Sequence, residues 1–173
     1  MKSFFRIGVT LLLATIASFA LVADYRYNEC SGATIKNHAG SDLTGQLSST
    51  GAILTKGEST LSLLGGGSMV VKHNSKLDLT GNMTISIWVK QSKREQQALV
   101  TRGETNADYF LGISSKGKIR YRHTDYGVYS ENSIPLNEWT HVVVTREHKD
   151  HDVKIYINSI MDSTHSYQNS PVS

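Results

Sequence analysis

The sequence predicts an all-β protein, a two-sheet antiparallel jelly-roll sandwich, and two observations carry that prediction. Through most of the chain apolar residues recur at every second position, which is the period of a half-buried strand. Gly, Asn, Ser and Asp clusters separate these runs at roughly even intervals, and no window shows the longer period of an amphipathic helix. Because one sheet alone leaves an apolar face uncovered, many short strands imply two stacked sheets.

The individual strands follow from this alternation. In the segment 83–90, Met83, Ile85 and Ile87 share one face, whereas Ser86 and Trp88 share the other. In the segment 152–158 the apolar positions again alternate with polar ones. We therefore expect strands at residues 21–28, 59–64, 68–72, 83–91, 97–103, 108–114, 118–124, 139–146 and 152–158.

The first 23 residues have the pattern of a secretory signal peptide. Lys2 and Arg6 precede an uncharged, mostly apolar run, which is shorter than the roughly 20 residues that span a bilayer. Small residues allow cleavage after Ala20 or after Ala23. We expect a signal peptide at 1–23, one domain at 24–173, and a secreted, periplasmic or cell-surface protein that leaves the membrane once cleaved.

Charge and cysteine content narrow the classes of partner. The net charge is +3, from 18 basic and 15 acidic residues, and removing Lys2 and Arg6 leaves 16 basic residues. A nearly neutral mature chain lacks the broad basic surface of a nucleic-acid-binding protein. The single cysteine, Cys30, has no partner within the chain, so it is either a small buried residue or half of an intermolecular disulfide.

Several segments then resemble one family, the LamG-like jelly-roll domains of the laminin G and concanavalin A-like lectin/glucanase type. Residues 75–90 resemble its "SLDLTGxFTISxWVK" stretch, and residues 136–145 are close to "LNxWHHVAVT". Further matches occur in the family's order at residues 25–30, 40–45, 98–103, 109–113 and 154–158. The resemblance implies a concanavalin A-like sandwich over the mature chain.

The resemblance weakens at the C-terminal end. The family continues beyond the region of Asp162 with a strand and then a closing strand, whereas residues 163–173 are polar and show no further alternation. We therefore expect a domain truncated at its C-terminus that lacks its last strand, with a sheet edge left exposed.

The resemblance also implies a structural calcium ion where the first strand meets the following glycine-rich loop. Calcium prefers carboxylate, amide and carbonyl oxygens. The corresponding ligands here are Glu29 (or Asn28), Asn37, the Gly40 carbonyl and Asp42. Asn37 stands where the family usually has Asp, and the alternative interpretation is a simple Asn/Gly/Asp turn without metal.

The distribution of acidic residues argues against an enzyme. Glycoside hydrolysis needs two carboxylates about 5–9 Å apart, and on a strand they would show as a paired-acid motif. The glutamates are instead scattered in expected turns, at Glu95, Glu104, Glu131, Glu138 and Glu147. Trp88 and Trp139 match family positions that are usually structural, so we do not expect them to contact a ligand.

The polar faces of the strands supply the candidate ligand-binding residues. Aromatic rings stack on sugars, and planar donors bond to their hydroxyl groups. The candidates are two residues of one strand face, three in or beside the following loop, and one on another strand: Arg120, Arg122, His123, Tyr126, Tyr129 and Tyr156. We predict a non-catalytic recognition module for a glycan or an extracellular or surface protein. The alternatives are a structural or adhesive sandwich without a specific ligand, and a degenerate glycoside hydrolase.

Overall fold

The computed structural model describes residues 21–29, 32–55, 58–103, 109–123, 126–150 and 152–166. The expected signal sequence up to residue 20, its cleavage after Ala20, and Cys30 lie outside these ranges. The chain forms two compact units, Met1–Leu77 and Asp78–Ser173, which are described separately. Within the described residues, no helix has both the length and the apolar character to cross a membrane.

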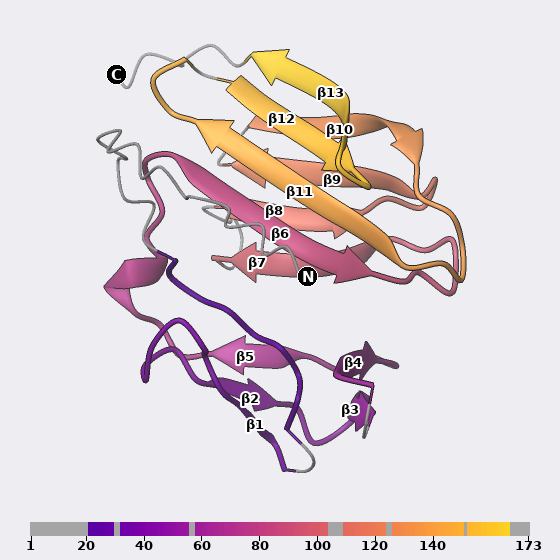
Figure 1. Cartoon of the computed structure of the whole chain (residues 1–173). Coiled ribbons are helices and arrows are strands. Elements are labelled where there is room, and N and C mark those ends of the chain that lie inside the picture. The colour runs from indigo at the N-terminus through magenta and orange to yellow at the C-terminus, as the bar shows by residue number, and fades with distance from the viewer. Residues whose placement is uncertain are drawn as a thin grey trace, which may run out of the picture. The chain divides into compact units, whose positions relative to one another are not determined.

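The C-terminal unit contains the predicted sandwich. One sheet has the strand order β10-β9-β8-β7 and the other β13-β12-β11-β6, and all the pairs are antiparallel. The two sheets are stacked as layers in Figure 1. Their strands are β6 (Met83–Val89), β7 (Gln97–Arg102), β8 (Tyr109–Ile113), β9 (Lys118–His123), β10 (Tyr126–Ser133), β11 (Thr140–Glu147), β12 (Asp152–Ile157) and β13 (Ile160–Ser166).

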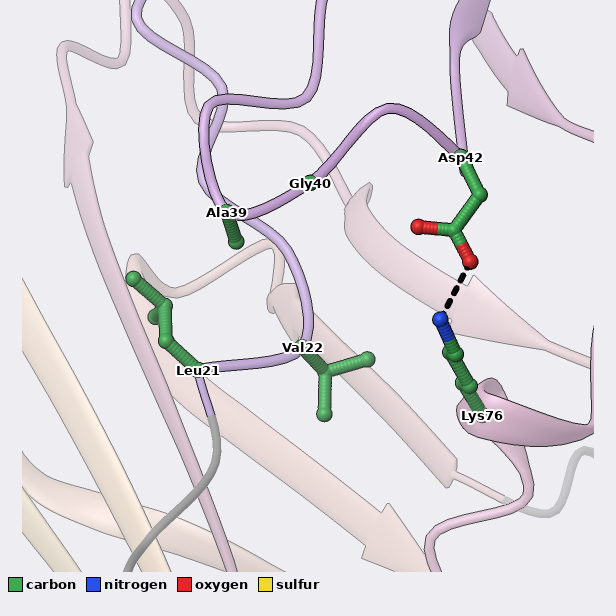
Figure 2. Close-up of a pocket in the computed structure, with 6 residues that line it drawn as sticks. All are labelled: Leu21, Val22, Ala39, Gly40, Asp42 and Lys76. Atoms are coloured by element: carbon green, nitrogen blue, oxygen red, sulfur yellow. Dashed lines mark hydrogen bonds and ion pairs between the residues drawn. The ribbon is translucent and has the colours of Figure 1, made fainter.

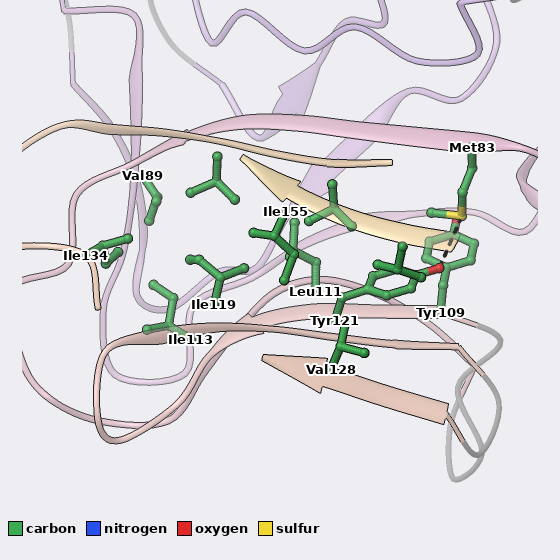
Figure 3. Packing of buried hydrophobic residues seen from close by; sticks show 13 residues of the cluster. Met83, Val89, Tyr109, Leu111, Ile113, Ile119, Tyr121, Val128, Ile134 and Ile155 are labelled. Atoms are coloured by element: carbon green, nitrogen blue, oxygen red, sulfur yellow. Dashed lines mark hydrogen bonds between the residues drawn. The ribbon is translucent and has the colours of Figure 1, made fainter. Parts of the chain in front are cut away.

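The core lies between these sheets and follows from the period of two. On β9, Ile119 and Tyr121 are fully buried, and on β12 Ile155 is fully buried, while their neighbours in sequence face outward. Figure 3 shows the Tyr121 hydroxyl directed at the Met83 sulfur, 3.6 Å away. The buried cluster comprises Met83, Val89, Tyr109, Leu111, Ile113, Ile119, Tyr121, Val128, Ile134, Val142, Val144, Val153 and Ile155. The alternation in the sequence therefore correctly predicted which side chains point inward.

The N-terminal unit is built from shorter pieces. It has a three-stranded sheet of β1 (Thr34–Ile35), β2 (Gly45–Leu47) and β5 (Met69–Val71), and a hairpin of β3 (Ala52–Thr55) and β4 (Thr60–Leu63). A short 3₁₀ turn, η1 (Ser75–Leu77), ends the unit. The strand expected at 21–28 is absent, because this segment is held by loop contacts such as the Tyr25 hydroxyl donating to the Leu43 carbonyl.

Two strands of the sandwich were missed by sequence reasoning. β10 was taken as a loop because its inward positions include Ser130, whose hydroxyl accepts a hydrogen bond from the Ile119 amide. β13 lies in a segment that was expected to hold no further strand after Ser163. Polar strands of this kind lack an apolar signal, so pairing with a neighbouring strand decides their structure.

β13 also covers an edge of the sandwich. The Asp162 carboxylate accepts hydrogen bonds from the backbone amides of Glu131 and Asn132 on β10, at 2.6 and 3.1 Å. A ring nitrogen of His165 lies 3.0 Å from the Tyr129 carbonyl oxygen. These contacts join the end strands of the two sheets, while the closing strand that the family has after this region stays an expectation that the described residues do not test.

Candidate functional site

An exposed aromatic pair dominates the outer face of the β13-β12-β11-β6 sheet. Trp88 on β6 is 62% exposed, and its ring is stacked on that of His141 on β11, with centroids 5.0 Å apart and planes 25° apart. The two residues are direct partners in the antiparallel register. Trp88 points outward because Ile87 and Val89, its neighbours in the strand, face the core.

Hydrogen bonds fix His141 in this arrangement. One ring nitrogen, Nε2, lies 2.8 Å from the Ser86 hydroxyl, and the His141 amide donates to the Asn158 side-chain oxygen at 2.9 Å. Because the imidazole is held at its edge, its stack with Trp88 forms a fixed planar surface. Ser86 and Tyr156 lie on the same outer face and add hydroxyl groups to it.

The outer face of the other sheet is cationic. Arg120 and Arg122 on β9 point away from the core, and both guanidinium groups lie over the Phe110 ring of β8, at 5.7 and 6.0 Å from its centroid. Arg120 also lies 5.7 Å from the centroid of the Tyr129 ring. Gly112 makes room for this packing, because a Cβ there would fall 2.5 Å from Phe110 Cζ.

The six predicted ligand-binding residues therefore do not form one site. Arg120, Arg122 and Tyr129 lie together on the outer face of the β10-β9-β8-β7 sheet. Tyr156 lies on the outer face of the opposite sheet. His123 and Tyr126 pair with each other at the end of the β9–β10 hairpin, where Tyr126 packs against the core and its hydroxyl donates to the Ser166 carbonyl.

The predicted calcium ligands lie in the N-terminal unit, but their contacts do not fit a cation site. Asn37 Oδ1 already accepts hydrogen bonds from the amides of Asp24 and Ala39, at 2.8 and 3.0 Å. Glu29 Oε1 accepts from the Lys36 amide at 2.7 Å, although its other oxygen is buried without a partner. Among the described residues, no group of three or more His, Cys, Asp or Glu side chains could hold a metal.

Lys76 lies beside Asp42, one of the expected calcium ligands. Gly40 and Asp42 line a small cavity of about 330 Å³, and Lys76 Nζ lies 2.6 Å from Asp42 Oδ2 within it (Figure 2). The hydrogen bond from the Lys76 ammonium group lowers the pKa of Asp42. A calcium ion bound to Asp42 would have to displace this ammonium group.

The sequence analysis did not predict the exposed pair of Trp88 and His141, because the family resemblance implied that the tryptophans are structural. Trp88 and Trp139 were expected to be structural, yet they are 62% and 49% exposed, values that do not occur in a packed core. A signal was present, since Trp88 shares the polar strand face with Ser86. Its pairing with His141 could not have been predicted, because it depends on the register between strands that are about 50 residues apart.

The family comparison places this sandwich among known proteins. A family model described as the concanavalin A-like lectin/glucanases superfamily matches residues 64–173. The chain belongs to this superfamily. The match spans the whole sandwich, so the lectin/glucanase-like fold expected from the sequence is confirmed.

Other comparisons are more distant. The solved structures similar to this member of the superfamily include a Ruminococcus gnavus IT-sialidase CBM40 bound to alpha2,3 sialyllactose, with 16% sequence identity and a TM-score of 0.45. The alignment covers 51% of this chain and 55% of that chain. A search of curated proteins found no match.

Proposed function

We propose that the protein is an exported, non-catalytic module that binds carbohydrate on the face formed by Trp88 and His141. The observation that carries the proposal is the exposed, stacked Trp88 ring on a sheet of a lectin/glucanase-type sandwich. An apolar ring of this size in water gains free energy when a sugar's C–H face covers it. The signal-like residues 1–23 support export.

The surroundings of the ring suit a saccharide. Ser86, Tyr156 and the His141 imidazole offer donors and acceptors on the same face, which can bond to the hydroxyl groups at a sugar's edge. Because β6 and β11 are paired along their whole length, these groups are held in place before binding. Preorganisation of this kind reduces the entropy that a ligand must lose.

For the face around Trp88, binding without catalysis is favoured over hydrolysis of a glycosidic bond. The side chains beside Trp88 on this face are those of Ser86, His141, Val143 and Tyr156, none of which is a carboxylate, and the paired Glu147 and Asp152 lie at the far end of the sheet. Glycoside hydrolysis requires a pair of carboxylates at the bond that is cut. Turnover of a polysaccharide by the purified protein would contradict the proposal and favour a degenerate hydrolase.

The test is a glycan-binding assay on the mature chain with Trp88→Ala. We expect neutral oligosaccharides from an array to bind the native protein and to lose at least about tenfold in affinity with the variant, equivalent to about 1.4 kcal/mol. Thr84→Ala is the matched control, because Thr84 lies on the same strand and the same exposed face, away from the Trp88–His141 pair.

Fluorescence gives an independent measurement. The chain has two tryptophans, so a Trp139→Phe variant reports on Trp88 alone. Stacking of a sugar should shift its emission to shorter wavelength, with the same saturation midpoint as the binding curve. If no glycan binds, or if Trp88→Ala binds as well as the native chain, the proposal is wrong, and a structural or adhesive role is favoured.

A further inference from the structure

A row of cations runs along the outer side of β9. Lys118, Arg120 and Arg122 alternate with the buried residues Ile119 and Tyr121, so all three side chains project from the same face of the β10-β9-β8-β7 sheet. Successive members are about 6.8 Å apart along the strand, because each residue advances the chain by about 3.4 Å. The row therefore presents three positive charges in a line.

The described residues form no ion pair with these three cations. None of the three forms an ion pair with a described acidic residue, whereas Arg26, Lys76, Arg102 and Lys154 elsewhere each do. The Nε atoms of Arg120 and Arg122 are buried and have no hydrogen-bond partner. An external acceptor cannot reach these buried Nε atoms, but the Nη groups of both half-buried arginines are not among the buried atoms and can bind one.

Aromatic rings hold the two guanidinium groups in position. Arg120 lies over Phe110 and Tyr129, and Arg122 lies over Phe110. Such stacking limits the rotation of a long side chain while its terminal Nη groups stay available. A guanidinium edge binds a carboxylate or a sulfate through two parallel hydrogen bonds. Tyr129, which is 44% exposed, offers a ring surface beside them.

We propose that this face is a second binding site, specific for anionic polysaccharides that carry carboxylate or sulfate groups. A linear polymer with regularly placed anions matches a linear row of cations, and Tyr129 can pack against one of its sugar rings. A sugar polymer is favoured over nucleic acid because the chain is of the lectin/glucanase type and is nearly neutral without Lys2 and Arg6. The site is separate from the Trp88 face, which lies on the other sheet.

Calorimetry with four probes tests the proposal. A heparin hexasaccharide carries sulfate and carboxylate, a galacturonic acid hexasaccharide carries carboxylate alone, and cellohexaose is neutral. Single-stranded DNA of twelve nucleotides provides phosphate. We expect one or both acidic sugars to bind the native chain, to weaken markedly between 50 and about 300 mM salt, and to bind more tightly than the DNA.

Variants locate the binding. Arg120→Gln/Arg122→Gln should lose at least tenfold in affinity for the acidic sugars, whereas Arg120→Lys/Arg122→Lys should lose less because the charge remains. Lys72→Gln/Lys149→Gln removes the same charge at two exposed positions and should bind as the native chain does. Tyr129→Leu should weaken binding independently of charge, which keeps the test valid if the double glutamine variant does not fold.

The outcome separates this proposal from the one for the Trp88 face. Trp88→Ala should leave binding of the acidic sugars unchanged, and the arginine variants should leave binding at the Trp88 face unchanged. Equal loss in the lysine control, no loss in the arginine variants, or DNA binding as tight as that of both sugars would each overturn the assignment.

Discussion

At the scale of single residues, Arg146 is the largest fully buried side chain of the sandwich. It occupies an inward position of β11, where the sequence pattern places an apolar residue. Its Nη2 donates to the carbonyl oxygens of Leu79 and Gly81, while Nε and Nη1 are buried without partners. A buried charge with unmet donors contributes little net stability, so we infer that its volume and its contacts with the loop before β6 matter most.

Two substitutions separate volume from charge at this position. Arg146→Ala should lower the free energy of unfolding by about 2–4 kcal/mol, because it leaves a cavity. Arg146→Met fills most of that space and should change it by less than about 1 kcal/mol, since an unpaired buried charge is removed along with two hydrogen bonds. Urea unfolding measures both. If the two variants lose equal stability, the hydrogen bonds rather than the volume hold the loop.

Residue chemistry could be predicted only where it depends on neighbours in sequence. The outward direction of Arg120 and Arg122 follows from their alternation with Ile119 and Tyr121. In the structure both arginines do lie on the outer face of β9. The stacking of both on Phe110 depends on the pairing of β8 with β9, and the chain alone does not show which rotamers the side chains adopt.

At the scale of elements, the hairpin between β12 and β13 shows how a missed strand is formed. Asn158 and Ser159 have φ angles of 50° and 68°, which are the left-handed values of a two-residue type I′ turn. The LamG-like domains that the sequence resembles usually have glycine at the position of Ser159. The turn forms nonetheless, because β13 gains backbone pairing with β12 and contacts with β10.

Restoring glycine at this turn should stabilise the protein. A non-glycine residue in the left-handed region is strained by about 1 kcal/mol, which glycine avoids. We expect Ser159→Gly to raise the free energy of unfolding by about 0.5–1 kcal/mol in urea denaturation. Ser115→Gly, at an exposed turn position without a positive φ, is the control and should give no gain. A loss of stability in Ser159→Gly would mean that the φ angle is not strained.

At the scale of the whole molecule, the calcium ion that the family resemblance implies can be compared with the contacts of its expected ligands. The resemblance implied Glu29, Asn37, Gly40 and Asp42 as ligands, yet Asn37 bonds to backbone amides and Asp42 is paired with Lys76. In this structure the cation that contacts Asp42 is the Lys76 ammonium group.

We therefore expect calcium to leave the stability of the native chain unchanged. Thermal unfolding in millimolar calcium and in excess chelator should give the same midpoint. Lys76→Met is the informative companion variant, because it frees the Asp42 carboxylate and should allow weak calcium-dependent stabilisation. A rise in the midpoint for the native protein would restore the calcium site that the family resemblance implies.

The sequence by itself determined that this protein is a β-sandwich and which residues of each clear strand face its core. Both depend on the alternation of apolar and polar residues, which can be recognised within a single strand of a few residues. The tertiary structure alone decided which strands share a sheet, and so placed Tyr156 on one outer face and Arg120 on the other. Strand pairing joins segments far apart in the chain, and its energy lies in contacts that no local pattern contains.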